Sequence, residues 1–360
     1  MKIGIDASRA LIKQRTGIEE YAYQTIKNLR EPLEDHEVFL YIKEKDKKKF
    51  DFDLPTKWKI RVVPFNYFWT QLGLSWEMLM HPVEILFIPA HTVPFVHPRK
   101  TIVTVHGLEY EHCPEGYSVY SRLFHHFFVT RSCIWAKKII AVSQNTKNDL
   151  IEMYKVSNKK IQVVYNGFKI EDKEVENISV KKYGKYILYI GRLEERKNLK
   201  NIIAAFEILK KKFNYKGNLL LAGNAGYGYE EISKKIDKSD FKKNIKLLGF
   251  ISDAEKQVFL TYADLFMFPS LCEGFGIPIL EAQSVGTPVI TSNFGPMDEI
   301  AGNNEILAIP TQSKHIADVA KRILFDEEMY ERVTKKGFEN VKRFSWEKCG
   351  NEIAKVLLSR

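Results

Sequence analysis

A glycine-rich turn is the part of this chain whose residue types could bind a charged ligand. Residues 263–268 are apolar enough for a buried strand, and Pro278 suits the first turn of a helix, where its missing N–H costs nothing. Gly274 and Gly276 lie between them and allow a ligand to approach the backbone closely. Amides near Gly276 and Ile277, together with the helix dipole, favour an anion such as a diphosphate.

Two carboxylates flank this turn. We expect Glu273 to lie in the loop and Glu281 in the first turn of the helix, so that both surround the anion site. Such acceptors suit a ligand that carries hydroxyl groups as well as phosphates. In the alternative interpretation, the turn is an ordinary connection between strand and helix, and Glu281 only complements the helix dipole.

A second group of charged residues follows another apolar run, residues 186–190. The polar residues 191–198 come next, and residues 199–212 have helical periodicity. Arg192 and Lys197 therefore leave the carboxyl end of a strand, where open α/β sheets bind ligands. A forked guanidinium and a compact ammonium are suited to a diphosphate leaving group.

Together these motifs resemble the family-4 retaining glycosyltransferases of the GT-B fold. The resemblance rests on Glu273 and Glu281, which are spaced as E-x7-E, on residues 191–198, and on Gly-Thr-Pro-Val-Ile at residues 286–290. Further matches lie in the first half of the chain, at residues 2–7, 16–18, 104–106, 141–146 and 164–167. The resemblance spans nearly the whole chain and implies a mannosyltransferase-like member of group 1.

The order of the elements indicates two domains. Apolar runs alternate with helical patterns from residue 2 to 164 and again from residue 186, which predicts parallel, doubly wound sheets. The polar residues 169–185 have no apolar periodicity and are expected to link the two series.

The resemblance implies an α/β protein of the GT-B class, with two Rossmann-like domains facing a cleft and a C-terminal helix that crosses back to the first domain. We place the N-terminal, acceptor-binding domain at residues 1–172 together with about 346–360. The C-terminal, nucleotide-sugar-binding domain would take residues 173–345.

Four residues receive catalytic roles from the resemblance. Arg192 and Lys197 would neutralise the diphosphate as its bond to the sugar breaks, and Glu273 would hold a hydroxyl group of the transferred sugar. His106 ends an apolar strand and matches the active-site histidine of the family. Many relatives carry aspartate where this chain has Gly107, so the pattern does not supply a hydrogen-bond partner for His106, and a structural histidine is the alternative.

The resemblance also implies a set of residues that contact the donor. Glu281 would accept hydrogen bonds from the ribose, and residues 249–251 would contact the base through backbone atoms, with a simple turn as the alternative. Gly17 would let an N-terminal loop approach the phosphate, although the family often has more glycine there. The full donor-binding set is Gly17, Gly191, Gly249, Phe250, Ile251, Gly274, Phe275, Gly276, Ile277 and Glu281.

The sequence Leu-Cys-Glu-Gly-Phe-Gly-Ile-Pro at residues 271–278 looks most like mannosyltransferase-type members and favours GDP-mannose as the donor. The alternatives are a transferase that uses a UDP-sugar, and a nucleotide-sugar epimerase or binding protein of the same fold. The acceptor would be a hydroxyl group of a glycan or a lipid-linked sugar in the synthesis of cell-surface polysaccharide or glycolipid. No cofactor is expected, because the nucleotide sugar is itself a substrate.

Asp51 and Asp53 form a D-x-D pattern, with which metal-dependent GT-A transferases hold a divalent cation. Here the pattern follows the Lys-rich residues 45–49, precedes Leu54 and Pro55, and has no strand leading into it. We therefore expect an enzyme that needs no metal ion.

Composition and charge narrow the class of protein. The chain has 360 residues, of which 45% are hydrophobic, enough for two cores. No apolar run approaches the length of a membrane span, and the N-terminus resembles a strand rather than a signal sequence, so we expect a cytoplasmic protein. The net charge of +10 is spread over both halves, which argues against a nucleic-acid-binding arm.

The cysteines are scattered along the chain. None of them forms a C-x-x-C pair, which favours reduced thiols over a disulfide framework or a zinc site. They are Cys113, Cys133, Cys272 and Cys349.

Aromatic residues are concentrated in two segments of the first half, residues 65–76 and 117–128. They could fill the core of the N-terminal domain. Alternatively, some of them form an exposed aromatic and basic face that docks on an anionic membrane surface, beside a lipid-linked acceptor. Peripheral binding to the inner face of the membrane would then weaken on mutation of Trp69, provided that this ring is exposed.

Overall fold

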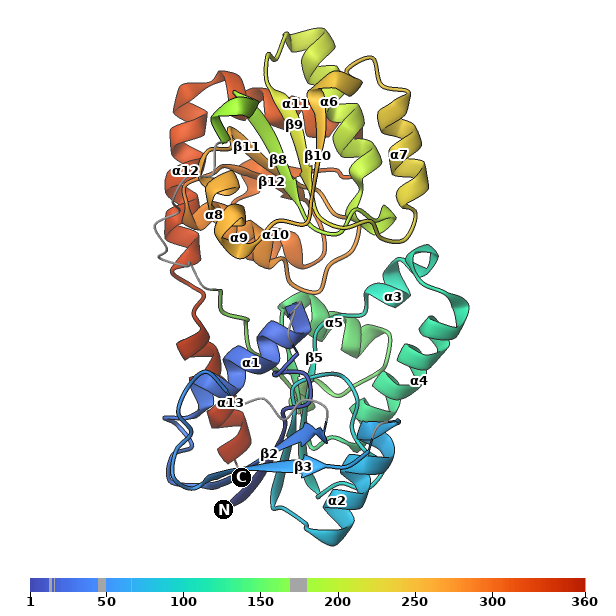
Figure 1. The fold of residues 1–360 in the computed structure, drawn as a ribbon, viewed down its shortest axis with the longest axis vertical. Coiled ribbons are helices and arrows are strands. Elements are labelled where there is room, and N and C mark those ends of the chain that lie inside the picture. The colour runs from blue at the N-terminus through green and yellow to red at the C-terminus, as the bar shows by residue number, and fades with distance from the viewer. Residues whose placement is uncertain (13–14, 16, 45–49, 66, 169–179, 360) are drawn as a thin grey trace. The chain divides into compact units, whose positions relative to one another are not determined.

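The computed structural model describes the chain except for residues 13–14, 16, 45–49, 66, 169–179 and 360 (Figure 1). It divides into two compact units. The first contains Met1–Leu108, Val119–Gly167 and Phe344–Arg360, and the second contains Glu109–Ser118 and Phe168–Arg343. The domain boundary that we expect after residue 172, and most of the expected linker, lie outside the described residues.

Within its described residues, the first unit contains a seven-stranded sheet with the order β3-β2-β1-β4-β5-β6-β7, and neighbouring strands are parallel. Its strands are β1 (Lys2–Asp6), β2 (Glu37–Lys43), β3 (Trp58–Val63), β4 (Ile85–Ile88), β5 (Lys100–Val105), β6 (Lys138–Ala141) and β7 (Ile161–Val163). Its helices include α1 (Gly17–Leu29), α2 (Ser75–Met80), α4 (Val119–Trp135), α5 (Gln144–Glu152), α13 (Trp346–Leu358) and the short π-helical turn η2 (Trp69–Leu74).

The described residues of the second unit form a six-stranded parallel sheet with the order β10-β9-β8-β11-β12-β13. Its strands are β8 (Tyr186–Ile190), β9 (Asn218–Ala222), β10 (Ile245–Gly249), β11 (Leu265–Phe268), β12 (Val289–Ser292) and β13 (Leu307–Ala308). Its helices are α3 (Glu109–His112), α6 (Leu199–Phe213), α7 (Tyr229–Asp237), α8 (Asp253–Thr261), α9 (Ile277–Ser284), α10 (Pro296–Ala301), α11 (Ser313–Phe325) and α12 (Glu327–Val341).

The central strands are apolar along their whole length because helices cover both faces of a parallel sheet. All four residues of β4 and of β11 are buried. This arrangement confirms the predicted class of two doubly wound parallel sheets. It also explains why short apolar runs, rather than alternating patterns, marked the strands in the sequence.

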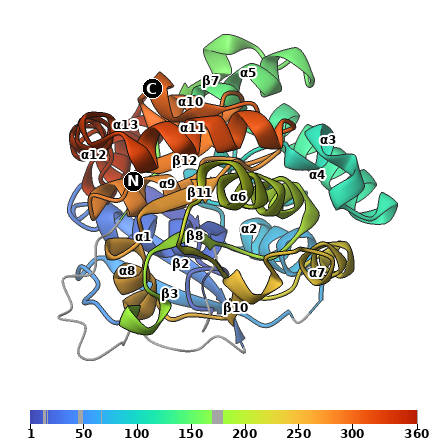
Figure 2. The same cartoon turned by 90° about the horizontal axis from the view of Figure 1, so that it is seen from above.

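The direction of winding reverses between β8 and β11 in the second sheet. Helix α6 packs against α7 and α11, while α9 packs against α8, α10 and α12. Figure 2 shows α6 and α11 side by side. In open α/β sheets, ligands bind outside the carboxyl ends of the strands at such a reversal. The loops that follow β8 and β11 occupy this place.

The C-terminal helix α13 belongs to the first unit, as the predicted fold class requires. It packs along α1, where the rings of Tyr21 and Trp346 lie 6.1 Å apart. The backbone of Asn28 lies so close that a Cβ atom on Gly350 would come within 2.7 Å of its carbonyl oxygen. Gly350 therefore allows the two helices to approach closely.

Residues 109–118 differ from the expected division of the chain. We expected them in the N-terminal domain, but Glu109–Ser118 group with the second unit. A disulfide between Cys113 and Cys272 holds this segment there. Sequence order alone could not reveal a cross-link between residues 159 positions apart.

Candidate functional site

The two sequence motifs of the second unit meet at the carboxyl edge of its sheet. The amide of Leu271, in the loop after β11, donates to the carbonyl of Arg196, in the loop after β8, at 2.8 Å. The side chain of Asn198 donates to the carbonyl of Pro269 at 2.8 Å and to that of Pro310 at 2.7 Å. These bonds bring together the segments that carry Lys197 and Glu273.

Lys197 and Glu273 form a buried ion pair. The ammonium donates to Oε1 of the carboxylate, and both side chains are only 11% exposed. Burial lowers the pKa of Lys197, although Glu273 beside it acts in the opposite direction. Burial by itself would raise the pKa of Glu273, but Lys197 and Arg196 hold it below its usual range. The pair thus offers a cation and an ionised acceptor in a poorly solvated place.

Arg192 differs from Lys197 in its exposure. Its side chain is 67% exposed, and Nε is 3.7 Å from Oε2 of Glu194. The guanidinium is therefore accessible to an incoming anion. The structure places Arg192 in the same loop as Lys197, as the sequence predicts.

Arg196 is a charged residue of the site to which the sequence analysis gave no role. Nη2 lies 2.7 Å from Oε1 of Glu194, and Nη1 lies 3.7 Å from Oε2 of Glu273. Glu109 and Tyr117, from the cross-linked segment, add to its electrostatic surroundings. Burial raises the pKa of Glu109, and it raises the pKa of Tyr117 to about 12. The sequence signals for Arg196 were its place next to Lys197 and its position within residues 191–198, which carry part of the family resemblance.

The predicted position of Glu281 is wrong by part of a turn. Helix α9 begins at Ile277 with Gly276 as its N-cap, so Glu281 is its fifth residue and lies beyond the first turn. Pro278 lies in the first turn, as expected. Oε1 of Glu281 accepts a hydrogen bond from Nζ of Lys256 in α8 at 2.6 Å. The pattern of the sequence gave no sign of this partner.

Glycines let the loops of this edge approach one another. Gly276 has φ 108°, a conformation that favours glycine, and Gly274, Phe275 and Gly276 are buried. A Cβ atom at Gly223 would lie 1.9 Å from the carbonyl oxygen of Gly191, so Gly223 allows the ends of β8 and β9 to meet. No role was predicted for Gly223, although its place directly after an apolar strand was the available signal.

Gly249 ends β10, and Phe250 and Ile251 follow it at the same edge. Gly249 has φ 71°, and its carbonyl accepts a hydrogen bond from the amide of Gly223 at 2.7 Å. Phe250 is exposed and Ile251 is half-buried. Their contact with a nucleotide base stays a prediction.

His106 lies in the first unit, directly after β5. It is buried, and its Nε2 donates to the carbonyl of Pro89 at 2.7 Å, which supplies the partner that Gly107 does not provide. Its ring contacts Tyr21 at 4.6 Å and His91 at 5.2 Å between centroids. Burial lowers the pKa of His106 to about 4. The ring is therefore neutral at pH 7, with its proton on Nε2.

Gly17 is the first residue of α1 and is exposed. Apart from its chain neighbours and the backbone of its own helix, a Cβ atom at this position would meet none of the described residues within 4 Å, so their packing does not require glycine there. Thr16, part of the same motif, lies outside the described residues. Contact of Gly17 with a phosphate stays a prediction.

The expectation of four reduced thiols is wrong for two of them. Cys113 and Cys272 form a disulfide, while Cys133 and Cys349 are buried thiols. The disulfide lies directly before Glu273 in the chain. Because its two cysteines come from distant segments, no spacing in the sequence could predict it.

The D-x-D pattern lies in the first unit and has protein partners. Asp51 accepts a hydrogen bond from the hydroxyl group of Tyr23, and the backbone carbonyl of Asp53 accepts one from Arg30 at 2.7 Å. Among the described residues, His, Cys, Asp and Glu side chains form no group of three or more that could hold a metal ion.

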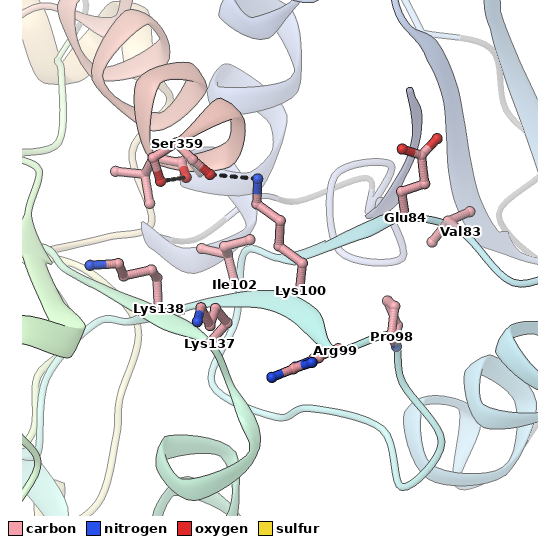
Figure 3. A pocket seen from close by; sticks show the side chains of 10 residues that line it. Val83, Glu84, Pro98, Arg99, Lys100, Ile102, Lys137, Lys138 and Ser359 are labelled. Atoms are coloured by element: carbon pink, nitrogen blue, oxygen red, sulfur yellow. Dashed lines mark hydrogen bonds between the residues drawn. The ribbon is translucent and has the colours of Figure 1, made fainter.

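The first unit contains a cavity of about 320 Å³ at the amino ends of β4, β5 and β6, the end of its sheet away from His106 (Figure 3). Its lining is basic, but Lys100 donates to the carbonyl of Ser359 at 2.6 Å at the end of α13, and Lys138 donates to that of Lys159 at 2.9 Å. These bonds satisfy backbone carbonyls. The cavity is therefore a poor candidate for the site that the motifs indicate.

Two family models match the chain in succession. "Glycosyltransferase Family 4" matches residues 15–172, and "Glycosyl transferases group 1" matches residues 170–340.

Curated relatives agree with these matches. O-antigen chain mannosyltransferase B of Escherichia coli is 28% identical over 70% of this chain and 68% of its own length. O-antigen chain mannosyltransferase RfbU of Salmonella typhimurium is 26% identical over 65% of this chain, and the match spans 63% of that protein, slightly less than two thirds.

Solved structures share the fold. Anabaena HepE, determined in complex with UDP-glucose, has a TM-score of 0.74 and 18% identity, covering 100% of both chains. WaaG, a glycosyltransferase involved in lipopolysaccharide biosynthesis, has a TM-score of 0.70 and 16% identity over 100% of both chains.

The burial of His106 leads to a pH prediction. The folded chain holds this ring neutral down to about pH 4, whereas an unfolded histidine binds a proton near pH 6.5, as is usual. The unfolded chain therefore binds more protons in this range, and His106 should reduce stability as the pH falls from about 6.5 towards 4. In NMR titrations, the His106 resonance, identified by its loss in His106→Gln, should titrate near pH 4. A midpoint near 6.5 would contradict the buried, neutral ring.

Proposed function

Because the chain belongs to the family-4, group 1 glycosyltransferases, we propose that it transfers a sugar, with retention of configuration, from a nucleotide-diphosphate donor to a hydroxyl group. GDP-mannose is the favoured donor, and the acceptor is a glycan or a lipid-linked sugar in the synthesis of cell-surface polysaccharide or glycolipid. The observation that carries the proposal is the Lys197–Glu273 pair at the winding reversal of the second sheet.

In the proposed reaction, the bond between the anomeric carbon and the β-phosphate oxygen breaks, and the acceptor oxygen bonds to that carbon. The hydroxyl proton leaves with the diphosphate. Lys197 and the exposed Arg192 would stabilise the charge that grows on the leaving group. Glu273 would hold a hydroxyl group of the sugar, together with the backbone amides of residues 274–276. Glu281 would bind the ribose, with Lys256 keeping its carboxylate in place.

The choice of donor rests on the relatives. Both curated relatives described above are named as mannosyltransferases, which supports GDP-mannose. HepE, in contrast, was solved with UDP-glucose, so a UDP-sugar is the alternative. An epimerase of the same fold is a further alternative, and a new nucleotide sugar formed from donor alone would reveal it. We also propose that catalysis needs no metal ion, which activity in excess chelator would support.

An exposed helix supports contact with an anionic bilayer. Helix α4 exposes Tyr120, Leu123, Phe124 and Phe127 on one face, at helical spacing. The helix contains no acidic residue, and the guanidinium of Arg131 lies 5.4 Å from the ring of Phe127. An apolar face with cationic neighbours is typical of binding at the interface of an anionic membrane. In the part of the chain that the structure describes, the helices are too short or too polar to span a bilayer.

Trp69 is not exposed and so has no place in the membrane hypothesis. That ring is 4% exposed, and its Nε1 donates to the carbonyl of Val63 at 3.3 Å. Trp69 is therefore part of the core, and its mutation is no test of membrane binding. Phe124 and Phe127, at 52% and 48% exposure, are the appropriate probes.

Transfer itself can be tested with purified protein, an extract of lipid-linked and glycan acceptors, and a panel of GDP- and UDP-sugars. We expect release of GDP and incorporation of mannose. Lys197→Ala and Glu273→Gln should each reduce turnover by about a hundredfold, the usual cost of losing a transition-state contact. Lys211→Ala is the control, because Lys211 forms an exposed ion pair with Asp240. Wild-type turnover in both site variants, with the fold intact, would contradict the assignment.

Membrane binding can be tested by sedimentation with vesicles that contain phosphatidylglycerol. The wild type should bind at low salt and dissociate at high salt, because screening weakens the attraction of basic side chains. Phe124→Ser combined with Phe127→Ser should weaken binding at least about tenfold, since two rings no longer enter the bilayer. Phe325→Ser, at an exposed ring in the second unit, is the control. Equal binding of the double variant, or no wild-type binding at low salt, would refute the membrane hypothesis.

A further inference from the structure

Arg196 connects the two loops of the site at several points, although the proposed chemistry gives it no part. Its carbonyl accepts a hydrogen bond from the amide of Leu271 at 2.8 Å. Its Nη1 donates to the carbonyl of Cys272 at 3.2 Å. The two residues that precede Glu273 are thus attached to one arginine, one through its backbone and one through its side chain. These contacts set the direction in which Glu273 leaves the loop.

The guanidinium of Arg196 also lies between two carboxylates. Glu194 anchors one side of the fork at 2.7 Å, and Glu273 lies on the other side at 3.7 Å. All three side chains are largely buried, with exposures of 21% for Arg196, 10% for Glu194 and 11% for Glu273. A planar guanidinium can serve several acceptors in fixed directions, which the compact ammonium of lysine cannot do.

We propose that Arg196 is a positioning residue that keeps Glu273 oriented and ionised while Lys197 turns its ammonium towards the diphosphate of the donor. The inference rests on the proposed function, because Lys197 must bind both Glu273 and the diphosphate of the donor. In the structure, Lys197 is bound to Glu273. A diphosphate with two or more negative charges competes with one carboxylate for the same ammonium.

The electrostatic reason lies in the burial of Glu273. Burial by itself raises the pKa of this carboxyl group. Lys197 and Arg196 are the two positive charges that lower the pKa of Glu273. When the diphosphate shares the ammonium of Lys197, Arg196 remains to stabilise the ionised carboxylate. Without Arg196, Glu273 would bind a proton at higher pH and could no longer accept hydrogen bonds with both oxygens.

The test compares Arg196→Gln and Arg196→Lys with the wild type over a range of pH. Arg196→Gln should lower kcat by about tenfold to a hundredfold, because Glu273 loses its orientation. The donor KM should change much less, since the proposal gives Arg196 contacts with Glu273 and Glu194 and none with the donor. The acid limb of the kcat profile should move upward by about one pH unit, the usual effect of losing a neighbouring opposite charge. Arg196→Lys keeps the charge and should leave the acid limb close to that of the wild type.

A double-mutant cycle with Glu194 tests the geometry. Glu194 lies 2.7 Å from Arg196 and 3.7 Å from Arg192. The part of its effect that passes through Arg196 should be lost in the Arg196→Gln background, so Glu194→Gln should lower kcat more in the wild type than in Arg196→Gln. Arg332→Gln is the matched control, because Arg332 forms an ion pair with Glu305 at 3.1 Å on the surface of the same unit.

The outcomes separate this inference from the proposed function. If the wild type transfers sugar but Arg196→Gln keeps its kcat and acid limb, the positioning role is refuted and glycosyl transfer stands. If Arg196→Gln does not fold, the acid limb and kcat of Glu194→Gln decide the question, and wild-type values there refute the role. If the wild type transfers no sugar from any donor, the proposed function itself fails.

Discussion

The buried ion pair between Lys197 and Glu273 is stable only because other parts of the second unit support it. Removing two opposite charges from water costs several kcal/mol per ion, and their attraction offsets this cost only when further hydrogen-bonding or charged partners are in place. Arg196 supplies such a partner for the carboxylate, and Glu194 supplies one for Arg196. The contact therefore requires two loops from different strands to be held in a fixed relation.

The sheet provides that relation. Because the winding reverses between β8 and β11, their following loops meet at the carboxyl edge without a helix between them. Glycine at position 223 lets the ends of β8 and β9 come together, and Gly276 allows α9 to begin directly after the turn. The effect of these features is to place charged groups where water is scarce, so that electrostatic stabilisation of a reacting ligand is strong.

The sequence predicted the elements better than the contacts between them. Apolar runs identified the strands because parallel sheets are buried on both faces, and the loop positions of Arg192, Lys197 and Glu273 followed from strand ends. Pairings between distant segments were not predictable, since no local pattern marks them. Three pairings are of this kind: the disulfide of Cys272, the hydrogen bond from Lys256 to Glu281, and the hydrogen bond from Arg196 to the carbonyl of Cys272. The aromatic segments were ambiguous for a related reason, because composition does not distinguish the core face of a helix from its exposed face.

In the function that we propose, the Lys197–Glu273 pair receives the diphosphate of a nucleotide sugar. A crystal structure with a bound nucleoside diphosphate would test it most directly. We expect the β-phosphate within hydrogen-bond distance of Nζ of Lys197, with Arg196 still beside Glu273. A diphosphate bound instead in the basic cavity near Arg99 and Lys137, with the Lys197–Glu273 contact unchanged, would contradict it.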